Sequence, residues 1–248
     1  MHFIRKTFLF FLLFSFAKVN AQQLKVQYRQ YEIKGTDKKD SAMQIFLKPY
    51  ADSLQKSMQQ VIGFAVNNLY KKQPEGGALG NFITDAILTM SRQKSKEHIH
   101  AALLNSGGVR SFIPKGDITV ERIFELMPFD NVVVFQEIDG KILQMLLDKI
   151  ANDGGWPIAG ISFSINTQKK ATNILIEGKP ISENELYTIA LPDYVANGGS
   201  NCEMLKPIEK KNTNYLIRDA LLDYTKMQTA QGKPIDAKTE NRIVYDNR

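Results

Sequence analysis

The sequence is poor in cysteine and histidine. Cys202 is the only cysteine among 248 residues, and there are only three histidines. A single thiol cannot close an internal disulfide, which excludes the small secreted domains that disulfides hold together. The composition, 43% hydrophobic and 10% aromatic, instead indicates a globular protein stabilised by a large apolar core.

Long hydrophobic runs are equally scarce. The main one, residues 8–16 (FLFFLLFSF), is shorter than the roughly 20 residues that span a bilayer. It follows Arg5 and Lys6 and precedes a small-residue site ending at Ala21, the order typical of a cleaved secretory signal. A buried N-terminal strand or helix is the alternative. We expect a signal peptide at 1–21 and one domain at 22–248, periplasmic or extracellular and not inserted in a membrane.

The chain carries no strong excess of either charge. Its formal charge is +6, but Arg5, Lys6 and Lys18 lie in the expected leader, which contains no acid. The remainder has 29 basic and 26 acidic residues, a net charge of +3. Its cations are scattered and are not interleaved with stacking aromatics, so the sequence does not indicate nucleic-acid binding.

Residues able to form a catalytic or metal centre are few. His98 and His100 lie two apart on an expected strand and would share a face, where they could hold a metal together. Glu97 would point to the opposite face, so we favour a structural role and expect no metal site. A Gly-x-Ser-x-Gly nucleophile motif is also lacking. The sequence therefore assigns no catalytic residue and no cofactor to this chain.

The pattern of apolar residues predicts both helices and strands. Alternation over 22–36 predicts a strand, and a helix is expected to begin at Asp40 or Ser41. Residues 74–77 break the chain before a helix at 79–91, capped near Gly80 or Asn81. Further helices are expected at 120–126, 141–150 and 215–225, and strands at 98–104, 132–138, 158–166, 173–176, 187–192 and 242–245, with a turn at 139–140. This mixture predicts an α+β fold, a mixed β-sheet with flanking helices.

Four short segments combine turns with polar and aromatic side chains: 79–86 (LGNFITDA), 104–110 (LNSGGVR), 127–131 (MPFDN) with 138–140 (IDG), and 191–199 (LPDYVANGG). In the second, Asn105 offers an amide donor and acceptor, and Gly107 and Gly108 allow a sharp turn. Arg110 offers a planar donor fork for phosphate or sugar oxygens. Taken alone, this segment would be an ordinary turn beside a surface cation.

In order and spacing, the four segments together resemble the C-terminal domain of the 5'-nucleotidase family, over roughly residues 40–245. The resemblance implies the α+β fold of that domain and a pocket for a nucleoside or nucleotide. Phe129 and Tyr194 would clamp the base between two rings, although core packing is the commoner role of Phe. The residues that the resemblance places in this pocket are Asn105, Gly107, Gly108, Arg110, Phe129, Asn131, Gly160 and Tyr194.

Two positions depart from the family pattern. Ser200 stands where family members carry an aspartate that holds the sugar hydroxyls, and Asn201 is the neighbouring substitute. Glu75 lies near the position of an arginine that family members direct at the phosphate. A carboxylate at that place would repel a phosphate, so we expect these two positions to weaken nucleotide binding.

The family's hydrolytic chemistry belongs to a separate N-terminal metallophosphatase domain, in which two metal ions activate water. The resemblance therefore implies a chain that is inactive alone. We expect an exported nucleoside- or nucleotide-recognition subunit of a split 5'-nucleotidase, with divalent metals held by a separately encoded metallophosphatase. A non-catalytic nucleoside-binding protein and a degenerate structural relative are the alternatives.

Overall fold

The computed structural model describes residues 26–32 and 40–246 and divides the chain into two units, 1–46 and 47–248. The expected signal peptide lies outside the described residues. Residues 26–32 are exposed and have no regular secondary structure, so the strand predicted over 22–36 is absent from its described part. An alternating pattern specifies a strand only where one face packs on a core, and these residues have no such contact.

Helix α2 (Ser41–Met58) crosses the boundary between the two units. The Asp40 carboxylate accepts hydrogen bonds from the backbone N–H groups of Ala42 (3.0 Å) and Met43 (3.1 Å), which confirms the predicted N-cap. None of the α2 residues is buried. In the part of the chain that the structure describes, no helix is long and apolar enough to cross a membrane.

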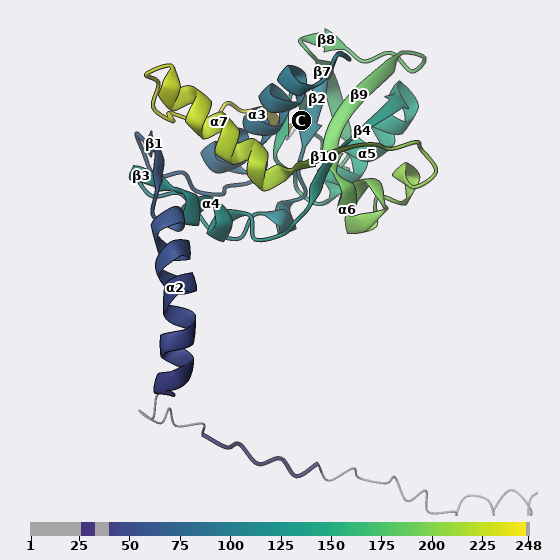
Figure 1. Ribbon diagram of the computed structural model, residues 1–248. Coiled ribbons are helices and arrows are strands. Elements are labelled where there is room, and N and C mark those ends of the chain that lie inside the picture. The colour runs from purple at the N-terminus through teal and green to yellow at the C-terminus, as the bar shows by residue number, and fades with distance from the viewer. Residues whose placement is uncertain (1–25, 33–39, 247–248) are drawn as a thin grey trace, which may run out of the picture. The chain divides into compact units, whose positions relative to one another are not determined.

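A five-stranded mixed sheet forms the centre of the second unit (Figure 1). Its strand order is β10 (Lys211–Leu216), β4 (Val132–Asp139), β9 (Leu186–Pro192), β2 (Ala101–Leu103) and β5 (Ile158–Ala159). Strands β9 and β2 are parallel, and the other neighbouring pairs are antiparallel. The predicted α+β fold with a mixed sheet is thus confirmed.

One face of this sheet packs against helices α3 (Gly77–Lys94) and α7 (Ile217–Ala230), which also contact each other. Helix α4 (Val120–Leu126) and a two-stranded sheet of β1 (Val61–Ala65) and β3 (Gly116–Thr119) complete this layer. The first apolar core fills the space between them. Alternate residues of the central strands face it, among them Ala102, Val133, Phe135 and Ala190.

The opposite face packs against α5 (Gly140–Asn152) and a four-stranded sheet. That sheet has the order β11 (Ile243–Tyr245), β6 (Ile161–Ile165), β7 (Ala171–Ile176) and β8 (Lys179–Pro180). The second core lies between these elements, and the intervening strand residues face it, among them Leu103, Val134, Ile138 and Ile189. Successive strand residues therefore alternate between the two cores.

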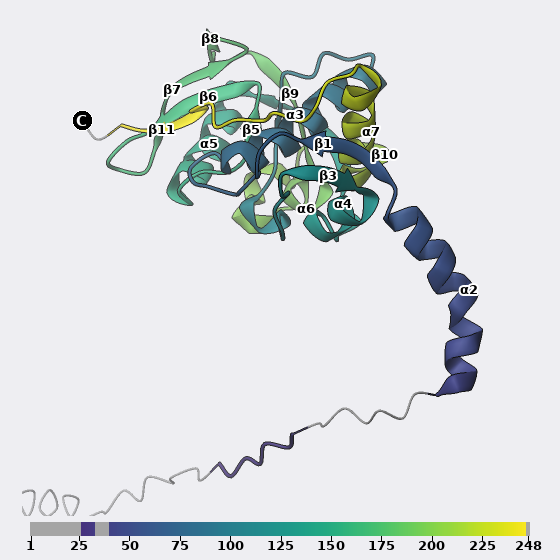
Figure 2. The same ribbon diagram turned by 90° about the vertical axis from the view of Figure 1, so that its left-hand side faces the viewer.

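The segment that follows α7 contributes a buried residue to each of the two cores. Ile235 lies in the first core and pairs with β1, where its N–H donates to the carbonyl of Phe64 at 2.8 Å. Ile243 lies in the second core, where β11 runs parallel to β6. Figure 2 shows this closing segment in yellow, running from α7 to β11.

Several predicted boundaries are wrong for local reasons. Helix α3 begins at Gly77, after Gly76 in a left-handed conformation (φ 82°), and not at a cap near Gly80 or Asn81. The predicted turn at 139–140 is the start of α5, because the Asp139 carboxylate accepts the N–H of Ile142 at 2.8 Å. Of the strand predicted over 98–104, only Ala101–Leu103 (β2) is a strand in the structure.

Candidate functional site

Seven of the eight residues predicted for the binding site line one pocket of about 380 Å³. Its volume falls in the range of small-molecule sites. The lining comes from three parts of the chain: the turn after β2, the turn between α4 and β4, and the segment around α6 (Asp193–Ala196). The lining residues are Asn105, Gly107, Gly108, Arg110, Phe129, Asn131, Tyr194 and Ser200.

Asn105 carries the clearest sign of a missing partner. It directly precedes the short 3-10 helix η1 (Ser106–Gly108), and its carbonyl accepts the N–H of Gly108 at 2.9 Å. The residue is 7% exposed, and its side-chain oxygen Oδ1 is buried without a hydrogen-bond partner among the described residues. An unmet buried acceptor costs about 1–3 kcal/mol, a cost that a donor on a bound ligand would remove.

Arg110 and Phe129 lie together at the pocket wall. The guanidinium carbon of Arg110 is 5.0 Å from the centre of the Phe129 ring, a cation–π contact. Phe129 is 39% exposed, so it is not a core residue, and a planar ligand can reach its ring. Arg110 is exposed and forms no ion pair within the described chain. Its charge is therefore available to an anionic group.

Arg218, at the start of α7, holds the turn that carries Phe129. Its Nη2 donates to Oδ1 of Asp130 at 2.6 Å and its Nη1 to the carbonyl of Met127 at 3.4 Å. The guanidinium also stacks over the ring of Phe124 at 4.2 Å. Arg218 thus holds both Met127 and Asp130, and Phe129 lies between these two residues in the chain. Sequence reasoning missed Arg218, because its partners lie about 90 residues away and no local pattern marks them.

The ring of Tyr194 packs against the backbone of Gly199. A Cβ on Gly199 would lie 2.5 Å from two ring carbons of Tyr194, so only glycine allows the ring to rest on this backbone. The Tyr194 hydroxyl accepts the N–H of Ser200 at 3.3 Å. The carboxylate of Asp193 accepts the N–H of Val132 at 3.1 Å, which ties this segment to the one bearing Asn131. The ring is half exposed and positioned before any ligand binds.

Ser200 and Asn201 both have left-handed backbone conformations, with φ of 57° and 60°. Two consecutive non-glycine residues of this kind are uncommon. Ser200 lines the pocket, whereas Asn201 is not among the lining residues. The structure therefore places Ser200, and not Asn201, in the wall of the pocket.

Gly160 is the one predicted site residue that the structure does not bring to the pocket. It joins β5 to β6 with a φ of 78°, and a Cβ there would lie 2.3 Å from the carbonyl oxygen of His100. The glycine is needed for close packing of two backbone segments. Its assignment to the pocket is corrected accordingly.

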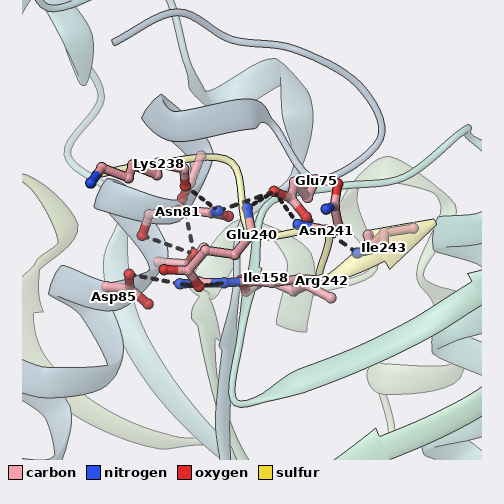
Figure 3. A network of polar contacts seen from close by, with 11 residues as sticks. Glu75, Asn81, Asp85, Ile158, Lys238, Glu240, Asn241, Arg242 and Ile243 are labelled. Atoms are coloured by element: carbon pink, nitrogen blue, oxygen red, sulfur yellow. Dashed lines mark hydrogen bonds and ion pairs between the residues drawn. The ribbon is translucent and has the colours of Figure 1, made fainter. Parts of the chain in front are cut away.

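Glu75 also has a different role from the one predicted. It is 1% exposed and faces the C-terminal segment (Figure 3). Its Oε1 accepts bonds from Nδ2 of Asn81 (3.1 Å) and the N–H groups of Glu240 (2.7 Å) and Asn241 (3.1 Å). Its Oε2 accepts the N–H of Ile243 at 3.3 Å. Both carboxylate oxygens accept hydrogen bonds within the protein and Glu75 does not line the pocket, so the structure gives this residue an internal role.

His98, His100 and Glu177 are the one group of described residues whose potential metal-ligand atoms all lie within 4.8 Å. The Nδ1 of His100 accepts the N–H of Thr188 at 3.0 Å, so its neutral ring carries the proton on Nε2. Burial, followed by the neighbouring His98, lowers the pKa of His100 and favours that neutral form. Glu177 is bonded to His98 (2.9 Å) and Arg92 (2.5 Å). In this arrangement the Nδ1 of His100 and the carboxylate of Glu177 are engaged in hydrogen bonds within the protein.

Residues 53–207 match the family described as the 5'-nucleotidase, C-terminal domain. The chain belongs to this family. The 5'-nucleotidase of Vibrio cholerae is 29% identical over 221 residues, and that of Vibrio vulnificus is 30% identical over the same length. Each alignment covers 84% of this chain but only 38% of the relative.

A solved structure of the family has the same fold. The 5'-nucleotidase precursor of Thermus thermophilus aligns with a TM-score of 0.71 at 27% identity, covering 84% of this chain and 44% of that one. The chain therefore spans less than half the length of the family members that it matches. The similarity identifies it with the C-terminal domain and leaves most of each relative without a counterpart in this sequence.

Proposed function

We propose that this chain is the nucleoside- or nucleotide-recognition subunit of a split 5'-nucleotidase. It would act outside the cytoplasm after removal of residues 1–21, and a separately encoded metallophosphatase would supply the metals. Family membership supports the ligand class. N-terminal sequencing of the protein from its own cells tests the export step, and an intact Met1 would contradict it.

The observation that carries the proposal is the unmet Oδ1 of Asn105 beside two exposed rings in one pocket. A base offers N–H donors at its edge and two flat faces, which match these groups. Stacking on Phe129 and Tyr194 is worth about 1–3 kcal/mol per base in related recognition sites. Arg110 would meet a phosphate, and Ser200 would make a single hydrogen bond with a sugar hydroxyl.

Hydrolysis is assigned to the partner. A two-metal site activates water and stabilises both the attacking and the leaving oxygen of a phosphate ester. The His98 cluster offers three ligand residues, too few for two metals, so we expect the residues of this chain to bind and orient the nucleotide. This chain should therefore turn over no nucleotide by itself.

Calorimetric titration with adenosine and AMP tests the pocket. We expect both to bind, AMP more tightly because Arg110 is unpaired. Replacing Phe129 or Tyr194 with Ala should weaken adenosine binding more than tenfold, and Asn105→Ala should weaken it about fivefold or more. Phe64→Ala, an exposed ring outside the pocket lining, is the matched control. Unchanged affinity in the Phe129 and Tyr194 variants would remove the clamp assignment.

Reconstitution tests the split arrangement. The protein is mixed with an exported metallophosphatase that lacks this domain, together with Mn²⁺, and phosphate release from AMP is measured. We expect a rate above that of the phosphatase alone, with the gain lost in the Phe129→Ala variant. No gain would overturn the split enzyme. A non-catalytic nucleoside-binding protein would then be favoured, because the pocket is formed entirely by this chain; failure to bind as well would indicate a degenerate relative.

A further inference from the structure

A second pocket, of about 350 Å³, lies between the C-terminal end of α3 and strands β4 and β10. These three elements are labelled in Figure 1. Its lining passes from the last turns of α3 through residues 95–97 to the two strands, and it shares no residue with the candidate nucleoside pocket. It is therefore a separate site of similar size.

The floor of this pocket is apolar. Val133 and Phe135 of β4 point from the central sheet into it, and the ring of Tyr215 contributes from β10. Strand β10 is an edge strand whose pairing with β4 is irregular between Asn212 and Leu216. Asn214 has a φ of 53° within that irregular stretch. The distorted edge strand thus borders an apolar surface suited to a flat ligand.

Three lysines surround the floor, and one of them has no partner. Lys211 forms an ion pair with Glu97 at 2.8 Å. Lys94 lies 4.3 Å above the ring of Tyr215 and 3.7 Å from Asp223. Lys96 makes no hydrogen bond or ion pair with any residue in the described ranges. Glu97 balances Lys211 and Asp223 balances Lys94, so Lys96 carries the one unbalanced positive charge among the three lysines.

A buried hydroxyl in the same lining also lacks a partner. Ser91, in the last turns of α3, is 2% exposed, and its Oγ makes no hydrogen bond within the described chain. A buried hydroxyl without a hydrogen-bond partner is unfavourable, and it lines the same pocket as the exposed cation of Lys96. A ligand with both an acceptor and a negative charge would satisfy the two groups together.

The acidic lining of an adjoining pocket indicates which end of the ligand carries the negative charge. The adjoining pocket shares Glu97, Phe135 and Lys211 with the first and adds Glu137 and Glu209. Its acidic lining would repel a negative group. The anionic end of a ligand therefore belongs beside Lys96, away from these two glutamates.

We propose that this pocket binds a small organic anion, a carboxylate or phosphate attached to a flat apolar body. The negative group contacts Lys96, the flat body rests on Val133 and Phe135, and a polar edge reaches Ser91. The site is independent of the nucleoside pocket, and its ligand is a different class of molecule from a neutral nucleoside.

The test is an NMR titration of the Phe129→Ala, Tyr194→Ala double variant with phenyl phosphate, with benzyl alcohol as the neutral analogue. The double variant removes the other pocket's aromatic clamp, and a parallel titration of the wild-type protein guards against an effect of the substitutions on folding. We expect saturable shifts of the backbone amides of 91–97 and 211–215 with phenyl phosphate, and much weaker ones with benzyl alcohol.

Charge variants complete the test. Lys96→Gln should weaken phenyl phosphate binding about fivefold or more, and Lys96→Arg should retain it, because one close charge pair at a partly exposed site is worth about that factor. Lys179→Gln, an exposed lysine of β8 outside the pocket, is the matched control and should change nothing. Equal binding of the two probes, or unchanged affinity in Lys96→Gln, would overturn the proposal.

Benzoate distinguishes the two head groups. A preference for benzoate over phenyl phosphate would assign a carboxylate ligand, and the reverse preference a phosphate; either supports the site. Shifts confined to 105–110 would place the anion at Arg110 instead and overturn it. Loss of adenosine binding bears only on the nucleoside pocket, so the two proposals fail independently.

Discussion

Replacing Glu75 with Gln should destabilise the protein strongly. The Glu75 carboxylate accepts four hydrogen bonds, three of them from backbone N–H groups of the closing segment (Figure 3). The amide of Gln turns one acceptor oxygen into a donor that faces N–H groups, and each unmet buried donor costs about 1–3 kcal/mol. We expect Glu75→Gln to lower the free energy of unfolding by about 2–3 kcal/mol. Glu75→Ala should lower it by about 4 kcal/mol, because all four bonds are lost.

Urea unfolding followed by circular dichroism measures these differences. Glu183→Gln is the control: its carboxylate is 77% exposed and 3.7 Å from Lys141, so its loss should change the free energy by less than about 0.5 kcal/mol. A Glu75→Gln variant as stable as the Glu183→Gln variant would refute the structural role of Glu75.

The same variant distinguishes the structural role from phosphate repulsion. If Glu75 acts only inside the fold, the ratio of AMP to adenosine affinity should be the same in Glu75→Gln and wild type. If Glu75→Gln raised the affinity for AMP and left that for adenosine unchanged, the negative charge of Glu75 would be shown to weaken phosphate binding.

Four further experiments test the site and the core. Gly199→Ala should weaken adenosine binding about tenfold, because the new methyl group displaces the Tyr194 ring, and calorimetry showing full affinity would contradict the packing described. Tyr194→Phe keeps the stacking ring and loses only the bond to Ser200, so calorimetry should show adenosine binding within about threefold of wild type; a larger loss would contradict stacking as the main contribution of this ring. Arg218→Met should weaken adenosine binding several-fold by releasing the turn that carries Phe129, and Arg218→Lys should restore part of it; no difference between the variants would argue against this positioning role. Burial raises the pKa of Cys202 to about 11, so at pH 8 a thiol reagent should label it at least about 100-fold more slowly in native than in urea-unfolded protein; equal rates would contradict its burial.

Local capping chemistry explains which helices were predictable. The helix at 120–126 was predicted with its observed bounds, and the side chain of Thr119 caps it by accepting the N–H of Arg122 at 3.3 Å. The start of α3 was misplaced because its cap is the backbone of Gly76. The polar side chain of Asn81, which resembled a cap, instead donates to Glu75 and to the carbonyl of Lys238. The sequence shows which side chains are able to cap a helix. It does not show whether such a side chain is instead hydrogen-bonded to a residue far away in the chain.

The candidate site was predictable to the extent that its residues lie in short motifs. Asn105 to Arg110 form one local turn, so their grouping follows from the sequence alone. Arg218 and Glu75 were not predictable in their roles, because their partners lie about 90 and up to 168 residues away. Glu177 was missed near His98 for the same reason, since 79 residues separate them. Long-range pairing is set by the fold and leaves no local pattern.

The closing segment also decides when folding can finish. Ile235 and Ile243 each enter a different core, and Glu75 is satisfied only by residues 240–243 and Asn81. Domains usually fold as units while the chain is being synthesised. In this protein the residues that join the two halves follow both of them along the chain, so neither core is complete in the nascent chain until residue 243 has left the ribosome. Loss of residues 235–243 would leave both cores incomplete.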